Sequence, residues 1–287
     1  MPRLAEYDSK ITFYAAVKRS ERITPEDSPD EVRHIILEVE PSHLRFQVGQ
    51  NIGVVVPGPH EFGNKEHFRL YSIAGLDEGR HGDTRTLSIC VRRCFYIDDF
   101  NGERYPGVAS NYLCDCRAGD LIALAGPFDS PFKLPDDPAS NLIMVGLGTG
   151  IAPFRAFIRY IYDTVGGWKG KVRLFYGAKT GMELLYMNDR NNDLANYYDE
   201  KTFKAFEAVS PSPALDAPIA LDQPLEKNAR ELGRLIQDPK TYVYIAGHEK
   251  ARDLMDRVMA KVLGSEDNWR RKKAEMTAGE RWAEVIY

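Results

Sequence analysis

The sequence predicts two domains of different class: an antiparallel β-barrel over residues 1–135 and an α/β domain with a parallel sheet over residues 136–287. In the first half, short apolar segments are separated by Gly, Pro and Asp turns, with almost no helical period, which is typical of a barrel or sandwich. Beyond about Pro135, compact apolar strands alternate with segments of helical spacing, which indicates a parallel α/β sheet. A chain of 287 residues is long enough for two hydrophobic cores.

Each expected element is bounded by turn residues. In the first half we predict strands at 11–24, 32–39, 46–57, 69–75, 86–93 and 121–125, with a hairpin-like loop through Asp98, Asp99 and Gly102. In the second half we predict strands at 141–146, 172–177, 203–209 and 242–247, and helices at 154–161, 193–200, 225–235 and 252–263. Residues 282–287 form an apolar, strand-like end that closes on an aromatic, Tyr287.

Composition excludes several classes of function. Hydrophobic residues at 43% and charged residues at 28% are typical of a globular protein, and a net charge of −4 argues against a general nucleic-acid binder. No apolar run is long enough to cross a bilayer and the first ten residues lack a signal-peptide core, so we expect no membrane insertion and a cytoplasmic location.

The four cysteines, Cys90, Cys94, Cys114 and Cys116, have no spacing suited to a metal site or an iron–sulfur cluster. Cys114 and Cys116 would lie on one face of a strand, a poor arrangement for a disulfide. We expect reduced thiols and no metal, so that any iron–sulfur partner must be a separate molecule.

Four stretches could carry chemistry, and each has a purely structural interpretation as well. Residues 69–75 place Arg69 and Tyr71 on one side of a strand and Ser72 on the other. Residues 146–150 put closely spaced glycines between a strand and a helix, where a pyrophosphate can bind, although the spacing is not that of the dinucleotide fingerprint. Residues 107–113 fit a phosphate-binding turn or a capped helix start, and residues 90–96 fit a nucleotide contact or a charged edge strand.

These stretches occur in an order that resembles the plant-type ferredoxin–NADP⁺ reductase family, and the resemblance extends from Arg22 to Tyr287. It implies an FAD-binding barrel and an NADP-binding α/β domain. The residues that it places at the flavin are Arg69, Tyr71, Ser72, Cys90, Val91, Arg92, Tyr96, Gly107, Val108, Ala109 and Ser110. Those that it places at the nicotinamide nucleotide are Gly148, Thr149, Gly150, Pro153 and Ser210.

The resemblance also implies individual roles. Arg69 and Ser110 would hold the FAD pyrophosphate, and Tyr96 would stack on its adenine. Tyr71 would stack on the isoalloxazine, with Ser72 near N5. Tyr287 would cover the opposite face of the ring and move aside for the nicotinamide.

Three departures from the family pattern bear on catalysis and specificity. Ala246 replaces the family's cysteine, and Val285 replaces its C-terminal glutamate, which leaves the adjacent Glu284 as the candidate catalytic carboxylate. Pro211 follows Ser210, and residues 214–223 contain no Lys, Arg or Tyr to bind a 2′-phosphate. The choice between NADPH and NADH therefore stays open. Lys227 or Arg230 could supply a cation for the phosphate, whereas Asp216 or Asp222 could accept a bond from a free ribose hydroxyl.

We therefore predict an FAD enzyme that moves electrons between NAD(P)H and a separate ferredoxin-like protein. Basic residues that could receive an acidic ferredoxin are Lys18, Arg19, Arg92, Arg93 and those at 270–273. Residues 183–186 and 192–198 also resemble the reductase module of benzoyl-CoA epoxidase component A, so the reductase subunit of an oxygenase is an alternative. A non-catalytic flavin-fold docking subunit is another.

Overall fold

The computed structural model of the protein describes residues 4–40, 45–60, 64–78, 85–98, 100, 102–199, 201–215 and 217–287. The backbone groups into two compact units. The first extends to Ser130 and includes Arg155–Phe157, and the second comprises Pro131–Phe154 and Ile158–Tyr287. Within the described residues, no helix combines the length and the apolar character needed to cross a membrane.

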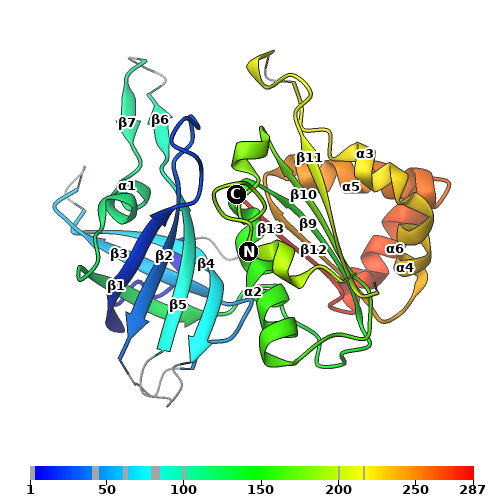
Figure 1. Ribbon diagram of the computed structural model, residues 1–287, viewed down its shortest axis with the longest axis horizontal. Coiled ribbons are helices and arrows are strands. Elements are labelled where there is room, and N and C mark those ends of the chain that lie inside the picture. Colours follow the sequence, from blue (N-terminus) through cyan, green and yellow to red (C-terminus); the bar gives the residue numbers. More distant parts are fainter. Residues whose placement is uncertain are drawn as a thin grey trace. The chain divides into compact units, whose positions relative to one another are not determined.

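The first unit is a closed barrel with the strand order β1-β2-β5-β4-β3-β8, and neighbouring strands run antiparallel (Figure 1). Its strands are β1 Phe13–Arg22, β2 Val32–Val39, β3 Asn51–Pro57, β4 Glu66–Glu78, β5 Arg85–Arg92 and β8 Leu121–Phe128. Alternate residues such as Ile35, Leu37, Ile52, Val54 and Ile89 are fully buried and form the interior. The predicted antiparallel barrel is confirmed.

The barrel unit also carries a helix and a hairpin. Helix α1, Val108–Asp115, contributes Ala109, Leu113 and Cys114 to the barrel core. Strands β6 Phe95–Ile97 and β7 Arg104–Pro106 form the predicted hairpin, although Asp99 lies outside the described residues. The prediction of one strand face for Cys114 and Cys116 was wrong, because Cys114 lies in α1 and Cys116 is its C-cap.

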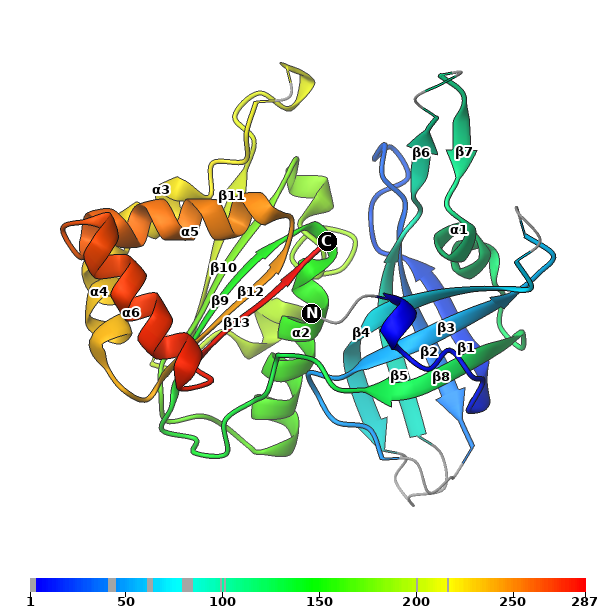
Figure 2. The same ribbon diagram turned by 180° about the vertical axis from the view of Figure 1, so that it is seen from behind.

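The second unit is built on a parallel sheet of five strands in the order β11-β10-β9-β12-β13 (Figure 2). The strands are β9 Asn141–Leu147, β10 Val172–Ala178, β11 Phe203–Val209, β12 Thr241–Gly247 and β13 Trp282–Ile286. Helices α3 Asp222–Lys227, α4 Ala229–Gln237, α5 Glu249–Val262 and α6 Glu266–Ala278 cover one face, and α2 Ile151–Arg159 covers the other. The predicted parallel α/β sheet is confirmed.

Local structure differs from the sequence prediction in three places. The helix expected at 225–235 is split at Asn228, whose side-chain amide donates to the Pro224 carbonyl at 2.8 Å and ends α3. The helix expected at 193–200 is a 3-10 turn over Asp193–Tyr197. Helix α6 was not predicted, because only Trp269 and Met276 among its 13 residues are buried and the apolar period is therefore weak.

Short 3-10 or π turns complete the chain. The 3-10 turns are Leu4–Glu6, Gly148–Gly150, Gly181–Glu183 and Pro213–Leu215, and a π turn over Tyr160–Thr164 extends α2. The turn at Gly148–Gly150 joins β9 to α2 and therefore lies at the carboxyl edge of the parallel sheet, where ligands bind in α/β proteins.

Candidate cofactor sites

The strand pair β3–β4 places Tyr71 and Ser72 in the barrel wall. Ser72 lies opposite Asn51 in the register, and its hydroxyl donates to Asn51 Oδ1 at 3.0 Å. Tyr71 packs against the barrel core, and burial, together with the neighbouring thiols of Cys94 and Cys114, raises the pKa of its phenol well above the usual range. Tyr71 is therefore a neutral ring at physiological pH, a suitable surface for a flat heterocycle.

Arg69, two residues before Tyr71, is exposed, and its Nη1 donates to the Phe68 carbonyl at 2.8 Å. The remaining donors of the guanidinium are of the kind that binds pyrophosphate oxygens in pairs.

The start of α1 joins two of the stretches that the sequence singled out. The buried Ser110 hydroxyl accepts from the Cys94 N–H at 3.1 Å. The Asn111 side-chain amide donates to the carbonyls of both Cys94 and Gly107 at 2.8 Å. The first N–H groups of a helix have no intrahelical acceptor. The start of α1, held in place by these bonds, is therefore suited to binding an anion.

Arg93 anchors the start of α1 through hydrogen bonds of its guanidinium. Its Nε donates to Glu31 Oε2 at 2.8 Å, its Nη1 to Asn111 Oδ1 at 3.0 Å and its Nη2 to Asp115 Oδ1 at 2.8 Å. Burial acts to raise the pKa of Glu31, but the hydrogen bonds from Arg93 and Arg33 outweigh it and lower that pKa. This anchoring role of Arg93 was not predicted, because an arginine after a strand gives no sign of its partners.

Tyr96 lies on the hairpin. Its ring stacks on that of Tyr105 with a centroid separation of 5.5 Å and an angle of 21° between the planes. Tyr96 is 49% exposed, so this pair presents aromatic surface on which a base could stack. Val91 is buried within β5, Cys90 is buried beside it, and Arg92 pairs weakly with Asp30 at 3.5 Å.

In the second unit, the glycine loop is shaped by two steric demands. Gly148 has φ +55°, a left-handed conformation that favours glycine. A Cβ on Gly150 would overlap the Ala246 carbonyl, so only glycine allows this approach to β12. Pro153 lies in the first turn of α2, where its missing N–H does no harm.

Tyr287 is held at two points of the same unit. Its backbone N–H donates to the Gly247 carbonyl at 3.1 Å, and its hydroxyl lies 3.0 Å from Thr149 Oγ1. The side chain is still 67% exposed. The structure therefore brings together the glycine loop and the aromatic that the sequence places 138 residues later.

The positions that depart from the family pattern are neighbours. Ala246 and Val285 face each other in the β12–β13 register, and both are buried and apolar. Glu284 accepts from Trp282 Nε1 at 2.6 Å and forms an ion pair with Lys273 at 3.0 Å. Lys273 also contacts both carboxylate oxygens of Asp256 at 3.0 Å, which links Glu284 to helices α5 and α6.

Ser210 follows β11 and is only 4% exposed. Its hydroxyl donates to the Ala217 carbonyl at 2.6 Å, and its N–H donates to the Lys179 carbonyl at 3.2 Å. Asp216 lies outside the described residues, whereas Asp222 begins α3. Lys227 and Arg230, the cations considered for a 2′-phosphate, are both exposed.

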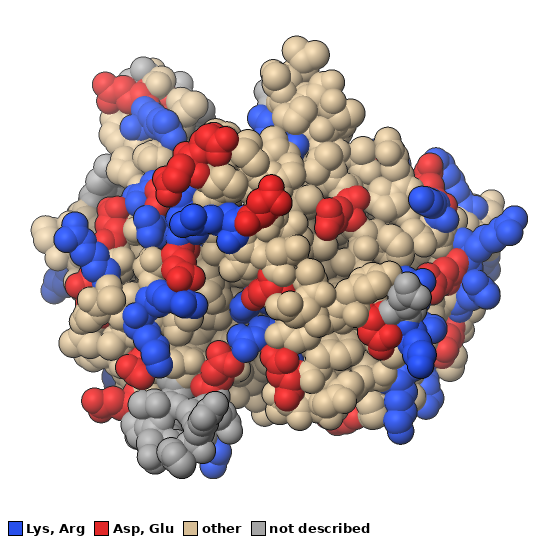
Figure 3. All heavy atoms as spheres, in the orientation of Figure 1, with Lys and Arg blue, Asp and Glu red and all other residues tan. Residues whose placement is uncertain are grey.

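The basic residues considered for docking are dispersed. Lys18 and Arg19 pair with Glu38 and Glu21 at 3.6 and 3.2 Å. Arg270 pairs with Asp267 at 3.3 Å on α6. Figure 3 likewise shows basic and acidic side chains interspersed over the face in view.

The four cysteines are free thiols, and burial raises the pKa of Cys114 to about 12 and that of Cys116 to about 11, which makes both unreactive. No group of three or more metal-ligating side chains occurs among the described residues.

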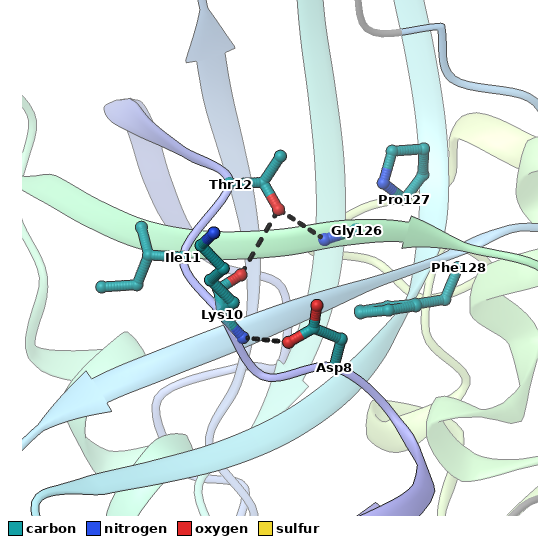
Figure 4. A pocket seen from close by; sticks show the side chains of 7 residues that line it. All are labelled: Asp8, Lys10, Ile11, Thr12, Gly126, Pro127 and Phe128. Atoms are coloured by element: carbon teal, nitrogen blue, oxygen red, sulfur yellow. Dashed lines mark hydrogen bonds between the residues drawn. The ribbon is translucent and has the colours of Figure 1, made fainter.

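A separate hollow of about 410 Å³ lies on the barrel unit (Figure 4). It is lined by Asp8, Lys10, Ile11, Thr12, Gly126, Pro127 and Phe128. Its polar groups bond to one another, as when the Lys10 N–H donates to Asp8 Oδ1 at 3.0 Å, and none of them is a predicted site residue.

A barrel with a half-buried tyrosine, a serine hydroxyl and an anion-binding helix start fits a flavin dinucleotide. A parallel sheet with a glycine loop at its carboxyl edge fits a nicotinamide nucleotide. These two units together define a class, the two-domain flavin- and nicotinamide-dependent oxidoreductases.

Comparison with known proteins identifies the family. Residues 144–256 match the model of the oxidoreductase NAD-binding domain. A ferredoxin–NADP reductase from Spirulina sp. is 33% identical over 98% of this chain and 97% of its own length. The chloroplastic leaf isozyme 1 from Oryza sativa subsp. indica is 31% identical over 98% of this chain and 78% of its own. The structure of ferredoxin–NADP⁺ reductase from Plasmodium falciparum has a TM-score of 0.71 at 19% identity and covers 98% of both chains, a likeness of fold.

The chain belongs to the ferredoxin–NADP reductase family, as its sequence predicted. It is an oxidoreductase, and FAD and NADP(H) are the cofactors of its family. The further resemblance to the reductase module of benzoyl-CoA epoxidase stays a prediction.

Proposed function

We propose that this protein transfers electrons between NADPH and a separate ferredoxin-like iron–sulfur protein by way of FAD bound to the barrel. The observation that carries the proposal is the match to a ferredoxin–NADP reductase over 97% of that protein's length. It is supported by site geometry in both units. FAD, when bound, accepts a hydride and releases the two electrons singly, which suits a junction between a nicotinamide and a one-electron carrier.

In the barrel, the N–H groups at the start of α1 and the Arg69 guanidinium would hold the pyrophosphate of the flavin nucleotide. Tyr71 would stack on the ring system and exclude water from one face. The hydroxyl of Ser72 donates its proton to Asn51 Oδ1, and its oxygen would lie beside the ring nitrogen that receives hydride, where it could act as an acceptor. Cys90, Val91 and Arg92 would lie along the nucleotide on β5, and Tyr96 would stack on the adenine.

In the α/β domain, the loop Gly148–Gly150 and the turn at Pro153 receive the nicotinamide half of the nucleotide. Tyr287, whose hydroxyl lies 3.0 Å from Thr149 Oγ1, would cover the second face of the flavin and give way to the nicotinamide. Holding the two rings in contact is chiefly a positioning problem, and the loop supplies the positioning.

Ser72 is the principal catalytic side chain of this proposal, because the family's cysteine and glutamate are replaced by Ala246 and Val285. A catalytic role for Glu284 stays a prediction. Its contacts with Trp282 and Lys273 favour a structural role instead, namely fixing β13 against α6.

A preference for NADPH over NADH requires a cationic side chain near the 2′-phosphate. Family membership supports NADPH, while the buried Ser210 hydroxyl is engaged by Ala217 and Pro211 supplies no donor. Lys227 and Arg230 are the side chains proposed to compensate. We also propose a cytoplasmic location, which the four free thiols support, and docking of an acidic ferredoxin on the basic residues named above.

The test is a set of rates on the purified protein. We expect a yellow flavin spectrum, ferricyanide reduction faster with NADPH than with NADH, and reduction of cytochrome c that requires added ferredoxin. A colourless protein that reduces ferricyanide with neither nucleotide would overturn the enzyme proposal and favour a docking subunit. A strong NADH preference, or activity only with an oxygenase component, would redirect it to an oxygenase reductase.

A further inference from the structure

The buried tyrosine of β10, Tyr176, has a hydroxyl placed among backbone groups of two separate loops. It donates to the Gly148 carbonyl at 3.0 Å and accepts from the Leu185 N–H at 3.2 Å, with the Glu183 carbonyl at 3.4 Å. The side chain is 0% exposed. A phenol this deeply buried keeps its partners, because losing one leaves an unsatisfied polar group away from water.

The carbonyl that Tyr176 binds belongs to the glycine loop. Gly148 adopts φ +55° and is exposed, and its carbonyl also accepts from the Ile151 N–H that begins α2. A glycine in this conformation has no side chain to restrict it, so its orientation depends on what holds its peptide group. Tyr176 is a side chain from the sheet that holds this peptide.

The hydrogen bonds continue from the loop to Tyr287. Gly148 is followed by Thr149, whose Oγ1 lies 3.0 Å from the Tyr287 hydroxyl. We infer that Tyr176 is a positioning residue that sets the glycine loop and, through Thr149, the resting place of Tyr287. This inference rests on the proposed function, in which the loop receives the nicotinamide half of NADPH.

The chain supplies a matched control. Tyr244 lies on β12, separated from β10 by β9, and is 1% exposed; its hydroxyl also donates to a backbone carbonyl, that of Lys133. Lys133 lies outside the glycine loop. Y176F removes the phenol's bonds to the Gly148 carbonyl and to the turn at residues 183–185, whereas Y244F removes the bond of a buried phenol to the Lys133 carbonyl. Only Y176F therefore releases the glycine loop.

The experiment compares both variants with the wild-type holoenzyme. Flavin reduction is followed by stopped-flow at saturating NADPH, and binding of NADP⁺ and of 2′-phospho-AMP is measured by calorimetry. We expect Y176F to slow flavin reduction about tenfold and to change NADP⁺ affinity, with 2′-phospho-AMP affinity unchanged within about twofold because that ligand lacks the nicotinamide half. Y244F should also lower the melting temperature but leave the reduction rate within about twofold of wild type.

Amide hydrogen exchange of the loop peptide 147–152 gives a readout that does not depend on activity. It should become faster in Y176F and stay unchanged in Y244F. Equal reduction rates and equal loop exchange in the two variants would overturn the inference, as would loss of 2′-phospho-AMP binding in Y176F. A wild-type protein that NADPH does not reduce would instead refute the proposed function, and the exchange comparison would still decide the role of Tyr176 in the loop.

Discussion

Replacing Ser72 by alanine separates the chemistry of the flavin site from its architecture. The hydroxyl donates to Asn51 Oδ1 at 3.0 Å, and Asn51 is only 6% exposed, so the variant leaves a buried carbonyl oxygen without this donor. We expect a stability loss of about 1–2 kcal/mol, near the net value of one neutral hydrogen bond plus a partial desolvation cost. The backbone pairing of Ser72 with Asn51 does not depend on the side chain, so FAD should stay bound.

The catalytic effect of S72A should be larger than its structural effect. Removing one preorganised hydrogen-bonding group from a reaction centre costs about 10²-fold in rate, or about 2.7 kcal/mol. The assay is stopped-flow reduction of the flavin by NADPH, with FAD content measured on the same sample. Ser88→Ala is the control, since Ser88 is a buried serine of the barrel wall, on β5, outside the proposed site. A rate for S72A close to that of S88A would refute the role of Ser72.

Three further predictions address other parts of the molecule. Glu284→Gln should lower the free energy of unfolding by about 1 kcal/mol, because it weakens the ion pair with Lys273, and should leave the rate of flavin reduction within about twofold of wild type. A large loss of rate would instead indicate that Glu284 is a catalytic carboxylate. Glu31 has a lowered pKa in the folded state, so its contribution to stability is present above the ordinary glutamate pKa of about 4.3 and is lost as pH falls through the folded value. Urea unfolding should therefore show E31Q less stable than wild type at pH 7, by about 1–3 kcal/mol, with the gap closing in more acidic solution; a gap independent of pH would contradict this. The rate of turnover with ferredoxin should fall steeply as the salt concentration is raised. A rate independent of salt concentration would contradict electrostatic docking of the ferredoxin.

Most of the architecture could be predicted because alternation and periodicity are local. Residues 203–209 and 32–39 were predicted as strands with the bounds that the structure shows. Helix α6 was not predicted because its contacts are largely polar, such as the ion pair of Lys273 with Asp256. A solvated helix face shows no apolar periodicity.

The sites were less accessible from residue patterns alone. Arg69, Tyr71 and Ser72 look like an ordinary strand, and only the order of the motifs along the chain gave them a function. Glu31, which binds Arg93, lies 62 residues before it, and Gly148, which binds Tyr176, lies 28 residues before it. Such contacts arise only when strands and loops come together in three dimensions.

The pair of tryptophans formed by α6 and β13 has a spectroscopic consequence. Trp269 and Trp282 meet edge to face with ring centroids 5.2 Å apart, and the Lys273 ammonium lies 4.8 Å from the Trp282 ring. Trp168, the third tryptophan of the chain, is also buried in the α/β unit. Intrinsic tryptophan fluorescence therefore reports the unfolding of that domain alone, while melting of the barrel must be followed through its tyrosines or its flavin.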